Sequence, residues 1–156
     1  MTKCEEIFKI ETEQYLAEIV EPTIRDFEQN PRSLRHAFLA AVTVYHTIDY
    51  LYGGPKQASN PRKTFRDESK TFGIVERVAH AFKHVQFGNK EEPKSRPLDV
   101  KGVITRPPGA IGEFAIGVSR IGDSVGGVTL DENVEIDILD TVNDAVIFLR
   151  SKLQQA

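Results

Sequence analysis

Residues 72–87 read FGIVERVAHAFKHVQF, and this stretch decides the fold because it has the pattern of an amphipathic helix. Arg77 and His84 are seven residues apart, so at about 100° per residue they project within about 20° of each other, with His80 one step further round. The apolar members fall within one arc of roughly 100°, and they are Ile74, Val78, Ala81, Phe82 and Val85. We therefore predict a helix with a polar seam, formed by Arg77, His80 and His84, beside its apolar face.

The composition describes an ordinary globular chain. It has 156 residues, 40% hydrophobic and 28% charged, and a domain of that length buries roughly 68–70% of its unfolded surface. The lone Cys4 excludes a disulfide framework and a cysteine metal knuckle. The first twenty residues are rich in glutamate, and no apolar run approaches ~18 residues. We expect one cytoplasmic domain over residues 1–156, without a signal peptide or membrane span.

Charge is spread unevenly along the chain. Residues 54–106 hold 12 Lys/Arg and 6 Asp/Glu, whereas residues 1–53 hold 5 and 9 and residues 107–156 hold 3 and 8. A basic middle third around the amphipathic helix is typical of a surface that faces an anion or a nucleic acid. The same asymmetry also fits basic loops that lie against acidic helices of the same molecule, and the sequence leaves both interpretations open.

Two helices are predicted before the amphipathic one. The first covers 12–29, with Thr12 as its N-cap and a kink or a break into two helices at Pro22, while residues 1–10 are weakly patterned and should fray. Asn30 and Pro31 should start the second, which runs to about Tyr52 and is apolar nearly all round, so we expect it to be central. Residues 53–64 read as a polar loop, and the amphipathic helix follows from about residue 65 or 70 to residue 87.

After residue 97 the periodicity changes from 3.6 towards 2. Short strands are predicted at 100–105, 114–118, 128–130 and 134–137, the last two joined by a three-residue hairpin loop at 131–133. Asp140 should cap a closing helix over 139–154. The predicted fold class is mostly α (α+β): a helical bundle over about 12–90, a small antiparallel β-hairpin or meander over 97–137, and the closing helix.

The first candidate site is the pair Arg77 and His84. An arginine can hold a phosphate through two parallel hydrogen bonds, and a histidine titrates near neutral pH, so it can transfer a proton during attack on a phosphodiester. Two helical turns separate them by ~10.5 Å along the axis, a spacing that neighbouring groups of one phosphate chain can bridge. The structural alternative is an arginine that pairs with a carboxylate of another helix and histidines that bond to carbonyl groups.

Two stretches carry a family resemblance. HTIDYL at 46–51 on the apolar helix, followed by RVAHAFKH at 77–84, resembles HEPN domains, the higher-eukaryote and prokaryote nucleotide-binding group. The hallmark of that group is an arginine followed after four to six residues by a histidine, which Arg77 and His84 match. The resemblance implies an up-and-down bundle, often dimeric, with a metal-independent ribonuclease site in its active members. Val78 departs from the pattern, because a polar residue commonly follows the arginine there.

From these observations we expect a nucleotide- or RNA-binding module, with metal-independent ribonuclease activity if it is an enzyme. Arg77 and His84 are the candidate catalytic residues. We expect no cofactor, and we expect the chain to form a homodimer. Four further residues are candidates for substrate binding: His80, Lys83, His46 and Asp49. The alternative, from another class, is a non-enzymatic dimeric interaction module in which the seam only orients helices.

A metal site is a third interpretation. Glu76, His80 and His84 stand at successive i, i+4 positions, and two histidines so spaced can bind zinc. His46 and Asp49 could complete the ligand shell. The glutamate spacing of the HExxH motif is absent, however, so the leading prediction includes no metal.

Overall fold

The computed structural model describes residues 3–84, 86–87, 98–110, 112–113, 115–116, 119, 121–130 and 135–155. Helices dominate these residues, and a small antiparallel sheet precedes the last helix, which confirms the predicted class. The elements are α1 (Lys3–Tyr15), the π-helical segment η1 (Leu16–Val20), α2 (Glu21–Gln29), α3 (Leu34–Leu51), α4 (Ser59–Glu68), α5 (Lys70–His84), β1 (Gln86–Phe87), β2 (Leu98–Asp99), the 3-10 turn η2 (Val100–Gly102), β3 (Val103–Arg106), β4 (Gly127–Leu130), β5 (Ile136–Asp137) and α6 (Ile138–Gln155).

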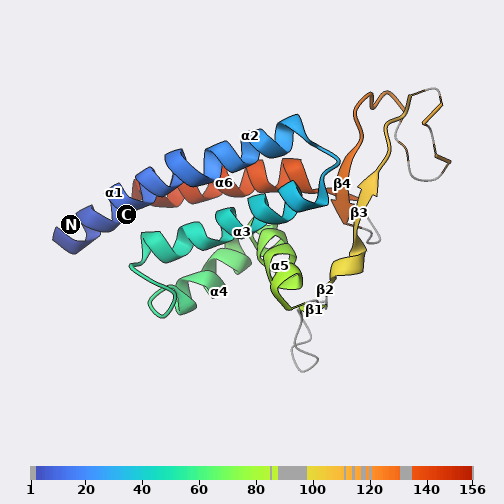
Figure 1. The fold of residues 1–156 in the computed structure, drawn as a ribbon. Coiled ribbons are helices and arrows are strands. Elements are labelled where there is room, and N and C mark those ends of the chain that lie inside the picture. Colours follow the sequence, from blue (N-terminus) through green and yellow to red (C-terminus); the bar gives the residue numbers. More distant parts are fainter. Residues whose placement is uncertain are drawn as a thin grey trace.

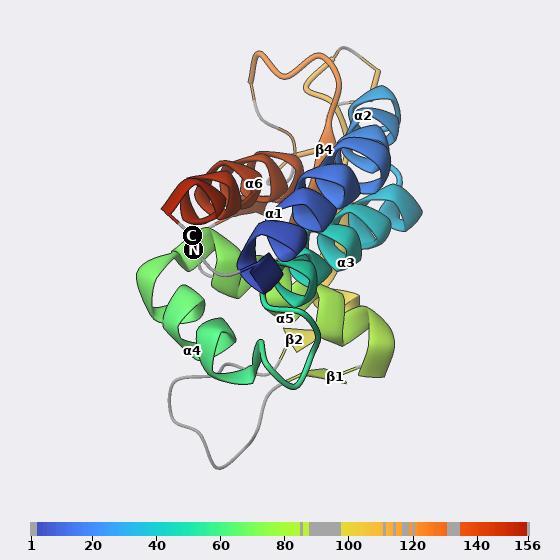
Figure 2. The ribbon, with the colours of Figure 1, turned by 90° about the vertical axis from the view of Figure 1, so that its left-hand side faces the viewer.

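The long helices lie side by side and α5 crosses them. In Figure 1, α1, η1 and α2 form one continuous rod, α3 returns antiparallel to it, and the sheet lies at the end where α2 turns into α3 and α6 begins. Figure 2 looks along the rod and shows α6 and α3 on either side of it, with α4 and α5 below. Because α3 contacts α1, α2, α5 and α6, it is the central helix, as its apolar sequence predicts.

Small and apolar side chains of α3 form the middle of the core. Ala37, Ala40, Ala41, Val44 and Ile48 are fully buried there. The alanines let neighbouring helices approach closely, and the larger side chains that fill the space come from the rod, α5, β4 and α6: Leu16, Val20, Phe27, Phe72, Val75, Val78, Leu130, Val142 and Leu149. Each fully buried large side chain contributes about 1.5–3 kcal/mol through the hydrophobic effect. No helix in the described parts of the chain has both the length and the apolar character to cross a bilayer.

The N-terminal prediction is wrong in its boundary. The chain is helical from Lys3, and Thr12 lies inside α1, where its hydroxyl donates to the Phe8 carbonyl at 2.6 Å. Residues 3–10 pack on the rest of the fold through Phe8, whose ring lies directly on Gly53, where a Cβ atom would overlap it. At the other end of α1, Tyr15 stacks on Tyr50 with ring centroids 4.0 Å apart.

The interruption predicted at Pro22 takes the form of η1. Pro22 has no amide hydrogen, so a regular helix through it would leave one carbonyl of the preceding turn without its partner. Just before it, the Glu21 amide donates to the Leu16 carbonyl five residues back, which widens the turn. The rod therefore continues into α2 without a sharp bend.

The α3–α4 region differs from the prediction at two points. Asn30 closes α2, and Ser33 is the N-cap of α3, its hydroxyl accepting from the His36 amide. Gly53 and Gly54, with φ of 71° and 132°, end the helix where expected. Residues 59–68, mostly assigned to a loop from the sequence, form α4, whose one buried side chain is Phe65.

Helix α5 begins at the later of its two predicted starts and ends three residues before its predicted end. It starts at Lys70, because Ser69 is extended and its hydroxyl accepts from the Phe72 amide at 3.2 Å. It ends at His84 rather than at Phe87, since Gln86 and Phe87 pair with Asp99 and Leu98 in an antiparallel ladder.

The sheet has the order β3-β4-β5 and is antiparallel throughout. The strand predicted at 114–118 is absent where the structure describes it, at Ala115 and Ile116; residues 114, 117 and 118 lie outside the described residues. The predicted hairpin is confirmed, but its loop is longer than three residues because Leu130 faces Ile136. Asp137 rather than Asp140 caps α6, its Oδ1 accepting from the amides of Leu139 and Asp140 at 2.9 and 3.2 Å.

Arg106 joins the sheet to the loop after it and to α6. Its side chain is 4% exposed and faces three carboxylates. Nε lies 2.8 Å from Glu135 Oε1, Nη2 lies 3.4 Å from Asp137 Oδ2, and Nη1 contacts Asp123 Oδ2. We call this group the Arg106 cluster. Because its members come from β3, the β3–β4 loop and the β5–α6 junction, it fixes the β end of the molecule.

Candidate functional site

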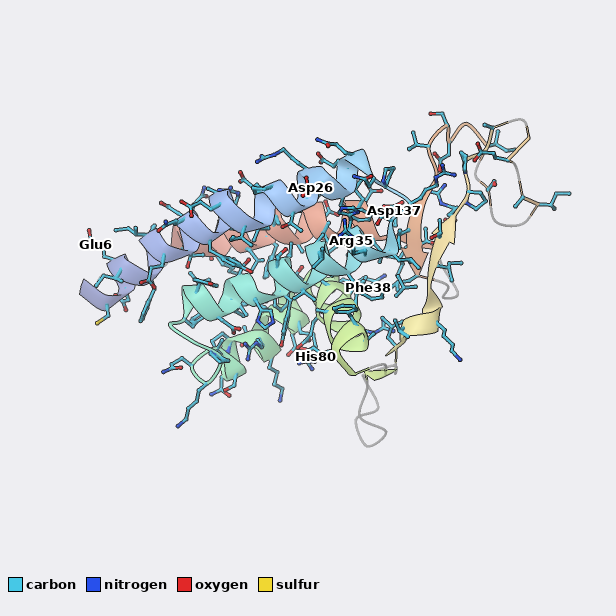
Figure 3. The ribbon with its side chains drawn as sticks, viewed as in Figure 1. Glu6, Asp26, Arg35, Phe38, His80 and Asp137 are labelled. Carbon is cyan, nitrogen blue, oxygen red and sulfur yellow. The ribbon has the colours of Figure 1, made fainter. Side chains whose placement is uncertain are left out.

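A pocket of ≈ 360 Å³ lies between α3 and α5 and is closed on one side by α4 and the loop before it. Figure 3 shows His80 on α5 at this side of α3. The lining combines apolar walls with two histidines and one arginine–carboxylate pair, and consists of Val42, Tyr45, His46, Asp49, Pro55, Arg62, Ala79, His80 and Phe82. A concave, mainly apolar site with a few convergent polar groups is the form that small-ligand sites take in proteins.

His46 is oriented by a carboxylate of its own helix. Its Nδ1 lies 2.8 Å from Asp49 Oδ2, three residues further along α3. Asp49 is held in turn by Arg62 of α4, whose Nη2 contacts Oδ1 and whose Nη1 donates to the Pro55 carbonyl at 3.0 Å. The Arg62 guanidinium also lies 5.4 Å from the centre of the Tyr45 ring. These contacts fix the carboxylate that orients His46, and such a pairing also stabilises the imidazolium form.

His80 is oriented by the phenol of Tyr45. Its Nε2 lies 3.1 Å from the Tyr45 hydroxyl, and the two rings meet edge to face at 5.1 Å. The Tyr45 ring contacts His46 in a similar way at 5.2 Å, so both imidazoles border the same aromatic side chain. Burial, together with the charge of Glu76, raises the pKa of Tyr45, which therefore remains a neutral phenol at physiological pH.

Glu76 lies behind Tyr45 and is 3% exposed. Arg66 of α4 approaches it with both ends of its guanidinium, Nε 2.6 Å from Oε2 and Nη2 3.1 Å from Oε1. Burial raises the pKa of the Glu76 carboxyl, whereas the charge and hydrogen bonding of Arg66, the charge of Arg62 and hydrogen bonding by Tyr45 act in the opposite direction. An ionised carboxylate at this depth depends on that arginine.

Three of the six candidate residues come together in the pocket, namely His46, Asp49 and His80. Arg77 is partly buried on α5 and does not line the pocket. Lys83 and His84 belong to α5, but their side chains lie outside the described ones. A catalytic role for Arg77 and His84 therefore stays a prediction.

Tyr45, Arg62 and Arg66 are parts of the site that the sequence does not predict, and Glu76 is predicted only as a metal ligand. Arg62 and Arg66 are four residues apart, a spacing that places two side chains on one face of a helix. The sequence contains this spacing, but it predicts a loop at residues 59–64, and in a loop a four-residue spacing does not place two side chains on one face. Tyr45 was hidden because its position fits the apolar core pattern of α3.

The described side chains do not form the metal site considered from the sequence. Among the side chains that the structure describes, no group of three or more His, Cys, Asp and Glu could hold a metal ion. Glu76 is engaged by Arg66, and the third proposed ligand, His84, lies outside the described side chains.

Comparison with known proteins gives no family to which the chain can be assigned. No protein-family model, no curated protein and no solved structure matches it. The pocket itself is therefore the basis for inferring function. Its chemistry is defined by two imidazoles, each bound by a hydrogen-bonding partner, that face one cavity with apolar walls.

Proposed function

We propose that the chain is a nucleotide- or RNA-binding module whose binding site is the α3–α5 pocket, with His46 and His80 as the acid and base of a metal-independent ribonuclease. The observation that carries the proposal is that both imidazoles border one pocket and that each is oriented, His46 by Asp49 and His80 by Tyr45. General acid–base catalysis needs groups that titrate near the working pH and are held in place, and two such histidines meet both needs.

The class of ligand follows from the walls and the charge around them. Phe82 lines the pocket, is 55% exposed, and stacks on Phe38 with ring centroids 5.0 Å apart. Phe38 therefore fixes the Phe82 ring, and a planar ligand ring can stack on its other face. Bases stack on such side chains irrespective of sequence. Residues 53–82, which include all of α4, carry six Lys/Arg and three Asp/Glu. A basic surround with an aromatic face fits a nucleotide better than a neutral apolar ligand.

The reaction that two histidines support is transphosphorylation of RNA. One neutral imidazole takes the proton of a 2′-hydroxyl as its oxygen attacks the neighbouring phosphorus. The 5′-oxygen of the next nucleotide leaves and takes a proton from the other, protonated imidazole. The products are a 2′,3′-cyclic phosphate and a 5′-hydroxyl, and no metal or other co-reactant is consumed.

The test is an RNA-cleavage assay in EDTA with a mixed-sequence pool, together with binding of mononucleotides by calorimetry. His46→Ala and His80→Ala should each lower the cleavage rate by about 10²–10⁴-fold, the range of acid–base contributions. Lys70→Ala, on the same helix but exposed and outside the pocket, is the matched control and should retain cleavage. If neither histidine variant alters binding or cleavage, the proposal is wrong.

The same variants separate the two other interpretations. Loss of cleavage in Arg77→Ala and His84→Ala, with His46→Ala and His80→Ala unaffected, would place the reaction at the HEPN-type pair instead of the pocket. If all four changes only lower the melting temperature or break a dimer, as sedimentation would show, the chain is an interaction module and the seam orients its helices.

A further inference from the structure

Each of the two pocket histidines has a nearby carboxylate that is paired with an arginine, although the two carboxylates come from different helices. Behind His46 lies Asp49 of α3, paired with Arg62. Near His80 lies Glu76, which is paired with Arg66 and hydrogen-bonds to the Tyr45 hydroxyl that contacts His80. Arg62 and Arg66 are four residues apart on α4, so they lie one turn apart on one face of that helix. A single turn of α4 thus contacts both carboxylates.

We propose that Asp49 and Glu76, held by the two arginines of α4, are positioning residues that set the protonation of His46 and His80 separately. The proposal rests on the proposed function in taking these histidines as the acid and the base. The electrostatic connection itself does not depend on any substrate, so it can be measured on the free protein.

The Asp49 connection is direct. Asp49 presents Oδ2 to His46 at 2.8 Å and Oδ1 to Arg62, and both Asp49 and Arg62 have side chains that are 15% exposed. Arg62 is fixed further by the Pro55 carbonyl. A carboxylate so constrained cannot turn away from His46, and it favours the imidazolium form of that ring.

The Glu76 connection passes through a phenol. Tyr45 has one hydrogen to donate and hydrogen-bonds to Glu76, and because an ionised carboxylate can only accept, we place that hydrogen on the side of Glu76. The phenol oxygen then accepts from Nε2–H of His80 across the 3.1 Å contact. Glu76 also precedes His80 by four residues on α5, so its charge lies on the same face as the imidazole. Both effects stabilise the imidazolium form of His80.

Charged and titratable groups lie near Glu76 and His80 on the other helices that line the pocket. Those that act on Glu76 or lie in the pocket with His80 are Tyr45, His46 and Asp49 of α3 and Arg62 and Arg66 of α4. Since the two arginines pair with different carboxylates, a change at one carboxylate should affect chiefly its own histidine.

The experiment is an NMR pH titration of the full chain labelled with ¹⁵N-histidine, with resonances assigned by His46→Gln and His80→Gln. Glu76→Gln should lower the pKa of His80 by roughly half a unit or more and leave His46 nearly unchanged. Asp49→Asn should do the reverse. These two isosteric variants are controls for each other, because a general loss of structure would move both histidines together.

Two further variants test the intermediate groups. Tyr45→Phe keeps the ring that borders both histidines but removes the hydroxyl, so it should lower the pKa of His80 and spare His46. Arg66→Gln should also lower the pKa of His80, because burial then keeps the Glu76 carboxyl protonated, while Arg66→Lys should stay near wild type. Should Arg66→Gln fail to fold, Tyr45→Phe and Arg66→Lys carry the measurement.

Equal shifts of both histidines in Glu76→Gln and in Asp49→Asn, or no shift in either, would overturn the inference. A selective shift in a protein that neither binds nor cleaves RNA would leave the inference standing and remove the proposed function. Cleavage that depends on both histidines without selective shifts would do the opposite.

Discussion

The pocket region and the Arg106 cluster both pair arginines with carboxylates, yet the carboxylates differ in their second partner. In the pocket, Asp49 also bonds to an imidazole, and next to the pocket Glu76 bonds to a phenol that contacts the other imidazole. In the Arg106 cluster, Asp123 Oδ1 accepts from the amides of residues 125 and 126, and Asp137 Oδ1 accepts from those of residues 139 and 140. Figure 3 shows the two places apart, with His80 on the α5 side of α3 and Asp137 where α6 begins.

This difference separates a structural use of charge from a chemical one. Backbone amides do not titrate, so a carboxylate bonded to them holds a turn or a helix end at any pH at which it is ionised. Imidazole titrates near neutral pH, so a carboxylate bonded to it alters a proton equilibrium. The number of carboxylates per arginine also differs between the two places. Arg106 faces three carboxylates, whereas Arg62 and Arg66 each pair with one.

The largest expected effect is at the centre of the Arg106 cluster. Arg106→Leu removes the only charge in the cluster that offsets three carboxylates, and breaking a buried ion pair from one side costs about 3–5 kcal/mol of unfolding free energy. Urea denaturation measures the loss. The matched control is Arg150→Ala, which removes a half-exposed pair with Glu21 and should cost less than about 1 kcal/mol. Similar losses in the two variants would remove the structural role given to the cluster.

A smaller effect is expected in the loop that the cluster holds. Gly126 has φ of 77°, and a Cβ atom there would overlap the Arg106 carbonyl. Gly122 has a similar φ of 86° but nothing within 4 Å of the same position. Gly126→Ala should therefore destabilise the fold by about 2–3 kcal/mol, against about 1 kcal/mol for Gly122→Ala, since both carry the left-handed strain and only one carries the overlap. Thermal unfolding of the pair checks the order.

The smallest expected effect is a pH dependence of the free energy of unfolding that arises from Glu76, next to the pocket. Because burial raises the pKa of Glu76 above 4.5, the folded state binds its proton more tightly than the unfolded state. Stability from this group is then greatest at low pH and falls as pH rises from the unfolded value through the folded one. Glu76→Gln lacks that term, so its stability relative to wild type should rise over this range in urea denaturation. The control is the exposed Glu113→Gln, whose profile should run parallel to wild type; an equally parallel profile for Glu76→Gln would contradict the prediction.

Much of the fold could be predicted because it follows from local pattern. The apolar faces of α3 and α6, the glycines after Tyr52 and the change of period at the sheet all lie within short windows of sequence. The errors arose where distant contacts decide. Phe8 packs on Gly53, and α4 packs on the helices beside it through Phe65, whose ring meets Phe148 at 5.2 Å. No short window around residue 8 or 65 contains those partners.

The candidate site was predictable only in part for a related reason. His46, Asp49 and His80 were singled out as polar residues on otherwise apolar helices, and the pocket contains all three. The groups that orient them were not found, because Arg62 and Arg66 act from a helix whose sequence reads as a polar loop. The seven-residue spacing of Arg77 and His84 shows that they share a face of α5, but not which neighbouring helix borders that face.

The π-helical segment η1 makes the number of residues before α2 matter. The bond from the Glu21 amide to the Leu16 carbonyl encloses one residue more than an α-helical bond does. Loss of one residue from 16–20 would let this turn become regular and would keep the facing of the rod before it, whereas loss of one residue between 9 and 14, in the regular part of α1, would rotate everything before it by about 100° around the axis. The second deletion would move Phe8 away from Gly53, on which its ring lies. The amino-terminal half of the rod is thus docked by residue count as much as by residue type.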